Sequence, residues 1–411
     1  MVQISFYFEK QMNTLIEYLK NIKHPIFKLA WTLVGLGCLV ISYLCVRSLF
    51  FTWIWGGELD FALTGQVGDF IGGVAGTFFA LSGTLLIFLS FKEQTKQNKR
   101  EAFETAFFQM LNLHRANVSE MSYTKFENGE LQKSEHRKVF RLIHQEFIEC
   151  YKEVRKFSNS KDFDYYLTRK HKNKLQNLIN QNNIGANVLD MAFIDIAYTI
   201  IYYGLGEEGE IIIRDKFKRK YKDTFFYPLL TYIKLKPKKE SKKRWQKWEH
   251  LNKLEYKVFK KANEEFYDYK KHKNEEKLSD DSSYLVIKKD YYKYYGGHQH
   301  RLGHYFRHLF QSFKYVNYHE YLSDKEKYFY AKTLRAQLST YEQAVIFTNS
   351  ISNLGWKWEF NPEIELLKSG ESAKESKLIT KFNVIKNLPG NHFYDITFNK
   401  YYPNVKFERE E

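Results

Sequence analysis

Cysteine, proline and glycine are scarce in this chain, which has three Cys, six Pro and 21 Gly among 411 residues. Cys38 and Cys45 lie in one apolar stretch, Cys150 stands alone, and no CxxC or paired Cys/His spacing occurs. This pattern excludes a disulfide framework and a zinc finger, and it is typical of a reducing compartment. Because Pro and Gly are the strongest helix breakers, their scarcity and the long charged–apolar periodicities indicate a mainly α protein.

The sequence also lacks the common catalytic motifs. It contains no G-x4-GK[ST], G-x-S-x-G or H-E-x-x-H, which argues against a P-loop nucleotide hydrolase, a serine hydrolase and a zinc protease. His300 and His304 have the spacing of metal ligands on a helix, but no carboxylate or Cys nearby in sequence completes such a site. We therefore expect no metal ion and no cofactor.

The first part of the chain has a net charge of zero. Residues 1–91 hold five Lys/Arg and five Asp/Glu, so the whole excess of +16 lies in residues 92–411. A basic soluble domain has two natural anionic partners, the inner leaflet of a membrane and nucleic acid, and charge alone does not separate them.

Two long stretches carry no charge at all. Leu29–Val46 has 18 residues and Phe70–Phe91 has 22. As helices they reach about 27 and 33 Å, against a hydrocarbon core of about 30 Å, so residues 29–91 are predicted to form two transmembrane helices. A cleaved signal peptide is the poorer interpretation, because the apolar stretch starts late and no A-x-A-like site follows it.

The distribution of Lys and Arg predicts the orientation of these spans. The loop Ser48–Asp69 has no Lys or Arg and three acidic residues. Basic residues flank the spans on the other side of the membrane: Lys10, Lys20, Lys23 and Lys28 before the first, and Lys92, Lys96, Lys99 and Arg100 after the second. The positive-inside rule therefore places both termini in the cytoplasm and the loop outside.

The second span carries small residues four positions apart. Gly72, Gly76 and Ala80 would form a flat helix face that another backbone can approach closely. This face would pack either on the first span of the same chain or on a second copy in a homo-oligomer.

We expect four parts: a cytoplasmic segment 1–28, the two spans 29–91, a stalk helix 92–122 and a basic helical cytoplasmic domain 123–411. Helical patterns continue over 136–157, 163–181 and 186–203, the last ending at Gly204. Further helices are predicted from about His300 and over 325–337. Another should start at Ser339, because Ser339 and Glu342 have the spacing of a capping box.

The segment Arg214–Lys247 is strongly basic, with 14 Lys/Arg and three acidic residues in 34, a net charge of +11. Aromatic residues interleave it. Basic and aromatic side chains together could bind RNA or anionic lipid, or could simply form a solvated surface. The candidate anion-binding residues are Lys216, Lys218, Arg219, Lys220, Lys238, Lys239, Lys242, Lys243 and Arg244.

A second dense region is Gly296–Phe313, which is rich in His and Arg. Its apolar residues Leu302, Phe306, Leu309 and Phe313 recur at helical spacing and should face a core. We expect Arg301, His304 and His308 on another flank, joining Arg335 and Glu342 in one polar constellation that serves chemistry, a switch or structure alone. The candidate catalytic residues are Arg301, His304, Arg307 and His308.

Four motifs carry a resemblance to a known family. They are Gly68–Gly73 entering the second span, Phe107–His114 after the Lys-rich part of the stalk, Gly303–Phe310 with Tyr315 beyond, and Arg335–Ser339 with Glu342 and Asn349. With these motifs the chain resembles the AbiC-like phage abortive infection membrane proteins of bacteria. The resemblance implies an antiviral role at the bacterial inner membrane, in which an unknown phage product triggers arrest or death of the infected cell.

The sequence leaves open how the protein would arrest or kill the cell. Some helical abortive-infection toxins are HEPN-like ribonucleases, marked by Arg, four to six residues and then His on a helix. Arg301 with His308 and Arg137 with His144 have this spacing, although Leu302 departs from the usual polar residue. Such a ribonuclease is metal-independent: His acts as acid or base and Arg stabilises the phosphate charge. The other kind is a non-enzymatic sensor and effector that acts through the membrane helices; a structural adaptor without toxic output is a third interpretation.

Overall fold

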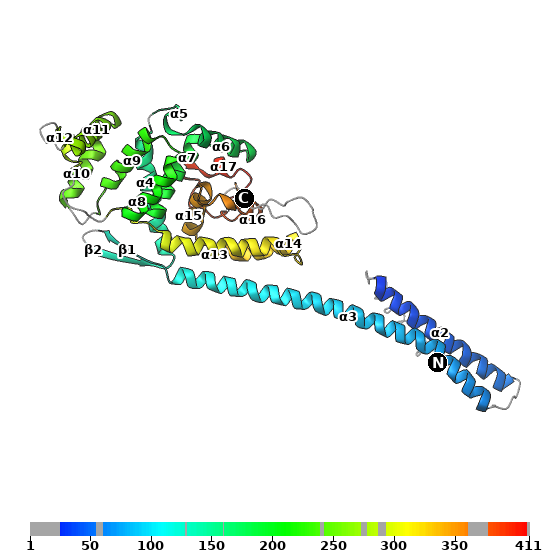
Figure 1. Ribbon diagram of the computed structural model, residues 1–411. Helices are drawn as coiled ribbons and strands as arrows, with labels where there is room; N and C mark the ends of the chain where they lie inside the picture. Colours follow the sequence, from blue (N-terminus) through cyan, green and yellow to red (C-terminus); the bar gives the residue numbers. More distant parts are fainter. Residues whose placement is uncertain are drawn as a thin grey trace. The chain divides into compact units, whose positions relative to one another are not determined.

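The computed structural model describes residues 25–54, 61–127, 130–158, 160–238, 242–272, 278–286, 293–360 and 377–408. Two compact units make up the chain, Met1–Thr105 and Ala106–Glu411. Figure 1 shows that helices dominate both, as predicted, with two apolar helices near the N-terminus followed by a large helical region. Most of the predicted segment 1–28 lies outside the described residues, and the predicted four-part division stays a prediction.

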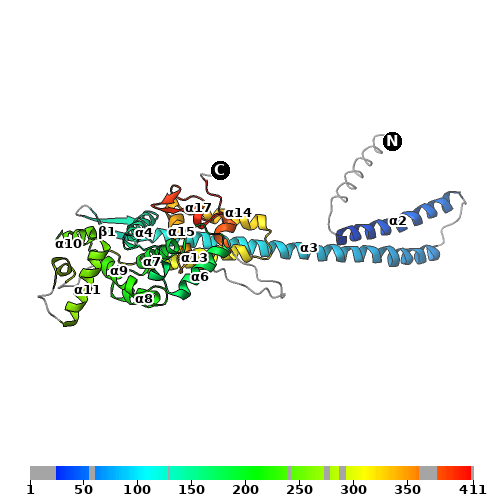
Figure 2. The ribbon, with the colours of Figure 1, turned by 90° about the horizontal axis from the view of Figure 1, so that it is seen from above.

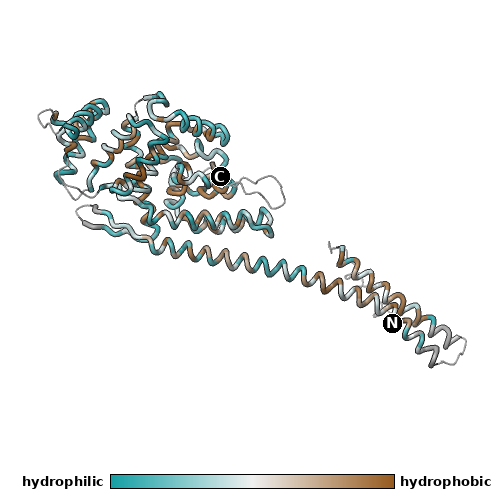
Figure 3. The backbone as a smooth tube through the Cα atoms, in the orientation of Figure 1, coloured by the Kyte–Doolittle hydropathy of each residue, from teal (hydrophilic) through white to brown (hydrophobic). Residues whose placement is uncertain are grey.

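The first unit contains two helices that are long and apolar enough to cross a membrane, α2 (Pro25–Ile54) and the beginning of α3 (Phe61–Ser119). Figure 3 shows brown, apolar residues along both and a teal, polar stretch of α3 after them. Only 11% of each apolar window is buried. The core helices of a soluble protein bury such residues, so α2 and the apolar part of α3 do not have the burial of core helices.

Small and polar residues hold α2 against α3. The Ser82 hydroxyl donates a hydrogen bond to the Ala30 carbonyl oxygen over 2.8 Å, and both residues are buried. Gly72, Gly76 and Ala80 are instead exposed, with open space around both glycines. The predicted small-residue face is therefore not the one that packs on α2, and its use in a homo-oligomer stays a prediction.

The second unit begins within α3 and continues through two short β-hairpins and many helices. Strand β1 (Ser122–Glu127) pairs antiparallel with β2 (Glu130–Glu135), and β3 (His392–Phe393) with β4 (Ile396–Thr397). The helices are α4 (Lys138–Lys156), α5 (Phe163–Tyr166), α6 (Arg169–Gln181), α7 (Val188–Tyr203), α8 (Glu207–Lys218), α9 (Asp223–Leu235), α10 (Lys242–Lys253), α11 (Tyr256–His272), α12 (Asp280–Ser283), α13 (Gln299–Tyr318), α14 (Asp324–Arg335), α15 (Thr340–Ile351), the 3-10 helix η2 (Trp356–Trp358), α16 (Leu378–Phe382) and α17 (Phe398–Tyr401).

Three helices form the centre of this unit. Helices α7 and α15 are buried on nearly all sides. Helix α7 is mostly apolar, as expected of a buried helix, whereas α15 also buries polar residues such as Gln343 and Asn349. The amphipathic α4 packs on both of them through a buried face that includes Val139, Phe140 and Ile143. Figures 1 and 2 show α10 and α11 together at one edge, away from this centre.

Several predicted helix ends are confirmed. The Ser339 and Glu342 side chains form the capping box at the start of α15, and α7 ends at Gly204 with a positive φ of 77°. The single helix predicted over 163–181 is wrong, because Leu167 and Thr168 leave the helix to pair with the chain at Lys220 and Tyr221. Hence α5 and α6 are separate helices.

Candidate functional site

Helix α13 is the element on which most of the predicted site residues lie. Its residues Leu302, Phe306, Leu309 and Phe313 are buried, which confirms the predicted apolar face. The opposite side of the helix carries His304 and Arg307, both exposed. Amphipathic packing therefore fixes which side chains of this helix are accessible to a ligand.

Glycines lock the start of α13 against the end of α7. Gly204 and Gly297 both have positive φ, 77° and 89°. A Cβ at Gly297 would lie 2.5 Å from the Tyr203 carbonyl oxygen, and one at Gly204 would lie 2.5 Å from the carbonyl carbon of Gly296. The His298 amide donates to the Tyr202 carbonyl oxygen over 2.9 Å. Only glycine permits this approach of the two backbones.

A cavity of about 970 Å³ lies where these elements meet, within the size range of small-molecule sites. It extends along the N-terminal half of α13 and reaches the segment after α15. Its lining residues are Tyr202, Tyr203, Gly296, Gly297, Gln299, His300, Gly303, His304, Phe306, Arg307, Phe310, Gln311, Asn349, Leu354, Gly355, Lys357 and Trp358. We call this cavity the α13 pocket.

The α13 pocket combines positive charge with aromatic rings. Arg307 and Lys357 are its basic residues besides histidine, and none of the described lining residues is Asp or Glu. The Arg307 Nε donates to the Gly303 carbonyl oxygen over 3.0 Å, which fixes the guanidinium along α13. Burial raises the pKa of the Tyr202 phenol, with a smaller opposing effect from Arg307, so the phenol is neutral at pH 7.

The far wall of the α13 pocket is held rigidly. The Asn349 amide donates to the Tyr198 hydroxyl over 3.1 Å, and a Cβ at Gly355 would lie 2.3 Å from the Asn349 carbonyl oxygen. Trp358 packs edge-on against Phe310 with ring centroids 5.2 Å apart. These contacts pre-form the wall, so a ligand would not have to order it.

The four candidate catalytic residues do not gather in one place. His304 and Arg307 line the α13 pocket. Arg301 instead donates to the Ser122 carbonyl oxygen over 2.7 Å and lies over the Tyr123 ring at 4.8 Å. Both ring nitrogens of His308 are buried, without a hydrogen-bond partner among the described residues. The residues expected on one polar flank of α13 therefore lie in different surroundings. A catalytic role for any of the four stays a prediction.

Glu342 is the centre of a separate buried cluster. Its carboxylate accepts a hydrogen bond from the Tyr305 hydroxyl over 3.1 Å, with His114 Nε2 at 3.8 Å and Arg137 Nε at 3.7 Å. Glu342 is fully buried, and the Ser339 amide also donates to its carboxylate over 2.8 Å, so Ser339, Tyr305 and Arg137 offset the cost of burying its charge. Burial lowers the pKa of His114 to about 4, so this imidazole is neutral at pH 7. The cluster connects α3, α4, α13 and α15.

Arg335 does not join this cluster as expected. Its guanidinium donates to the carbonyl oxygens of Phe382 and Asn383, over 3.0 and 3.2 Å, and so ties α14 to α16. The sequence predicted Glu342 as a capping residue and as a member of a polar constellation, but its partners Tyr305, His114 and Arg137 were missed. These partners lie far from Glu342 in the sequence, so no local pattern predicts that they contact it.

The histidine of the second HEPN-like pair, His144, lies in an apolar environment. His144 packs against Phe393 with ring centroids 4.3 Å apart, and burial lowers its pKa to about 4. Its partner by spacing, Arg137, donates to the Gln337 carbonyl oxygen over 2.8 Å. Neither Arg–His pair therefore has both side chains at the α13 pocket.

Histidine burial predicts acid sensitivity. Because the folded-state pKa of His144 is about 4 and an unfolded His has about 6.5, the unfolded chain binds more protons between these values. Stability should fall as the pH drops from about 6.5 to about 4, by roughly 3 kcal/mol for one such group. His144→Leu should remove this part of the loss, measured as thermal unfolding at pH 7.5 and 4.5. The exposed His392→Leu is the control, and equal acid loss in both variants would contradict the assignment.

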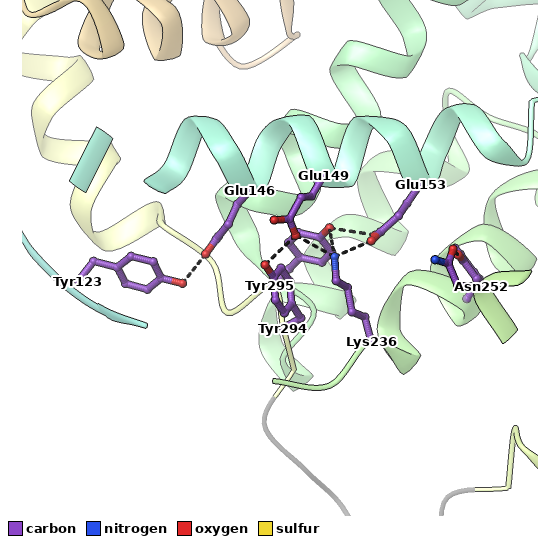
Figure 4. Close-up of polar contacts among 9 residues, drawn as sticks. Tyr123, Glu146, Glu149, Glu153, Lys236, Asn252, Tyr294 and Tyr295 are labelled. Carbon is purple, nitrogen blue, oxygen red and sulfur yellow. Dashed lines mark hydrogen bonds and ion pairs between the residues drawn. The ribbon is translucent and has the colours of Figure 1, made fainter. Parts of the chain in front are cut away.

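A row of carboxylates on α4 forms another polar network, shown in Figure 4. Lys236 is only 5% exposed and lies 3.0 Å from Glu149 and 2.6 Å from Glu153. The hydroxyls of Tyr294 and Tyr295 donate to the same two carboxylates over 2.7 and 2.9 Å. Burial lowers the pKa of Lys236, but Glu153 and Glu149 outweigh it and hold the pKa above its usual value.

The same row continues to Glu146, one turn earlier on α4. Glu146 is buried, accepts a hydrogen bond from the Tyr123 hydroxyl over 2.5 Å, and lies 2.8 Å from His298 Nε2. All three carboxylates thus have partners, so this network fastens β1, α13 and the end of α9 to α4. It requires no ligand to explain it.

Several side chains of the basic segment pack in the core or form ion pairs within the domain. Its aromatic residues Phe217, Tyr221, Phe226 and Tyr232 are buried in the core, so they are not available to stack on bases. Lys220 forms an ion pair with Asp195 over 2.9 Å, and Arg214 and Lys234 both pair with Glu210. Of the other candidate anion-binding residues, Lys218, Arg219, Lys242 and Lys243 are exposed, Lys216, Lys238 and Arg244 are half-buried, and Lys239 lies outside the described residues. Anion binding there stays a prediction.

Comparison with known proteins gave one match. The model of a family described as "putative phage abortive infection protein" matches residues 297–369. This confirms the resemblance predicted from the sequence over that segment and supports a role in abortive infection. All lining residues of the α13 pocket except Tyr202, Tyr203 and Gly296 lie in the matched segment. No curated protein and no solved structure matches.

Proposed function

We propose that the protein is a membrane-anchored abortive infection protein whose helical domain acts as sensor and effector. The match over residues 297–369 is the observation that carries the proposal. The two apolar helices support the anchor, because their side chains are exposed rather than packed in a protein core. Helix α3 is continuous from Phe61 to Ser119, so one helix belongs to both units and offers a covalent route for a signal.

The proposed location is the bacterial inner membrane, with both termini in the cytoplasm. In a variant without its natural cysteines, Asp60→Cys should react with a membrane-impermeant maleimide on intact spheroplasts, since the positive-inside rule places its loop outside. Lys96→Cys is the matched control and should react only after permeabilisation. The reverse pattern of labelling would show that the orientation is inverted.

The experiment that tests the proposed function is phage plating on bacteria that carry the full chain. The sensor and effector hypothesis expects fewer plaques, membrane depolarisation after infection and intact cellular RNA. RNA cleavage that is lost in Arg301→Ala or His308→Ala would establish the HEPN-like alternative instead. Full plating efficiency for every phage of a diverse panel, with the chain in the membrane fraction, would refute both.

A further inference from the structure

Residues 106–119 of α3 belong to the second unit and lie beside α13 in Figure 1; we call this stretch the α3 dock. The ring of Phe107 packs edge-on against Tyr330 of α14, with centroids 5.0 Å apart. The buried side chains of the dock recur at helical spacing and form one face: Phe107, Leu111, His114 and Val118. Burial of this face is what holds the dock on the domain.

His114 is the residue of this face that is poorly suited to burial. It is only 2% exposed, and neither of its ring nitrogens has a hydrogen-bond partner among the described residues. Its Nε2 lies 3.8 Å from the Glu342 carboxylate, which is too long for a hydrogen bond. The Tyr305 ring, 5.4 Å away, donates its hydroxyl to Glu342 instead. A neutral imidazole has one donor and one acceptor nitrogen, so both are buried here without compensation.

A second imidazole in the same condition faces the dock from α13. Both ring nitrogens of His308 are buried, and neither has a partner in the described part of the chain. Burial is the largest cause of the low pKa of His114, and His308, Arg137 and Arg115 lower it further, so the two imidazoles lie close together. Two neighbouring helices thus each bury an unpaired imidazole at one contact.

The α3 dock also lacks the close packing of the centre of the domain. Helix α4 packs along α7 and α15, whereas α3 approaches no described helix of the domain over a comparable length. At the edge of the dock, the Arg115 Nε donates to the Gln337 side chain over 3.1 Å, but this hydrogen bond is exposed to solvent. A contact with sparse packing and uncompensated polar groups opens more readily than a core.

We propose that the α3 dock is a releasable contact: in a minor state of the protein it leaves α13 and α15, and water solvates the rings of His114 and His308. Burial of the apolar face favours the docked state, whereas the unpaired nitrogens favour release, so the two imidazoles set the balance. Because α3 continues without a break to Phe61, release frees the end of a helix that also belongs to the first unit. That this release carries the signal to the membrane rests on the proposed function; the release itself does not.

The test is hydrogen–deuterium exchange of the detergent-purified full chain. A released helix without its packed face frays, so amides of residues 106–119 should exchange at least about tenfold faster than those of α7. His114→Leu removes the unpaired nitrogens and keeps an apolar side chain on the face. It should slow exchange in this stretch about tenfold and raise the unfolding temperature by about 2 °C or more. His308→Leu should act in the same direction.

Two matched controls separate this effect from that of any buried histidine. His298 is as buried as His114, but its Nε2 lies 2.8 Å from Glu146, so His298→Leu should lower the unfolding temperature. His171 is buried on α6, and its Nε2 has no partner within the described ranges. Because α6 lies outside the dock, His171→Leu should leave the exchange of residues 106–119 unchanged.

Three results would overturn this proposal: exchange of residues 106–119 as slow as that of α7, unchanged or faster exchange in His114→Leu and His308→Leu, and a lower unfolding temperature in both variants. If one variant does not fold, the other decides. Failure of both to fold also counts against release, because the imidazoles would then support the packing. These measurements need no phage, so failure of release and failure of phage protection are seen separately.

Discussion

Replacing Lys236 by Met should destabilise the helical domain more than any exposed substitution. Lys236 lies between Glu149 and Glu153, and its removal leaves carboxylates without their cation, Glu153 in a site only 11% exposed. Breaking a buried pair in this way costs about 3–5 kcal/mol, which corresponds to a fall in unfolding temperature of roughly 6–10 °C. The measurement is thermal unfolding of the purified full chain.

Two further variants separate charge from packing in this network. The triple variant Lys236→Met, Glu149→Gln, Glu153→Gln should regain most of the lost stability, because no unpaired charge remains and the tyrosine hydroxyls still have acceptors. The exposed Lys218→Met should unfold within about 1 °C of wild type. If Lys236→Met unfolds at the wild-type temperature, the network does not stabilise the fold as described.

Gly297→Ala should be the second most damaging change, and it has a matched control next to it. At Gly297 a Cβ meets the Tyr203 carbonyl oxygen at 2.5 Å, and φ is 89°. Backbone strain and overpacking together predict a loss of about 3 kcal/mol or more, seen as lower expression and lower unfolding temperature. At Gly296 a Cβ meets nothing within 4 Å.

Gly296→Ala should therefore fold like wild type and keep the α13 pocket. Equal stability of Gly296→Ala and Gly297→Ala would contradict the close approach of α7 and α13. Damage by both would also count against it, since open space at Gly296 leaves no steric reason for loss.

Local signals in the sequence predicted much of the fold. The capping box at Ser339 and the helix end at Gly204 are local signals, because each depends only on residues close to it in the sequence. The structure confirms both. The hairpin of β1 and β2 was missed, although Asn128 and Gly129 between its strands are a strong hairpin signal.

The candidate site was predicted only in part, because its walls come from distant segments. The apolar periodicity of α13 placed His304 on an accessible flank, but it placed Arg301 and His308 there as well, and nothing local predicted that Tyr202 and Lys357 would line the same pocket. Likewise Glu342 meets His114, more than two hundred residues away. Such contacts depend on tertiary packing, which one sequence does not reveal.

In the basic segment the structure shows where the aromatic residues lie, whereas anion binding by its charged residues stays a prediction. Its aromatic residues were considered for base stacking because charges surround them, yet Phe217 lies on the buried side of α8 and Tyr232 on that of α9. A helical period in the sequence identifies these two as core residues in retrospect.

The most direct measurement of the proposed function is a single cycle of infection at high multiplicity, when nearly every cell receives phage. A membrane-anchored abortive infection protein predicts that the culture stops growing or lyses early and releases far fewer phage per infected cell than a control strain. A variant chain without residues 25–91 should lose this effect while accumulating to the same level. Infected cells that survive and continue to divide, or an unchanged phage yield, would contradict abortive infection by this protein.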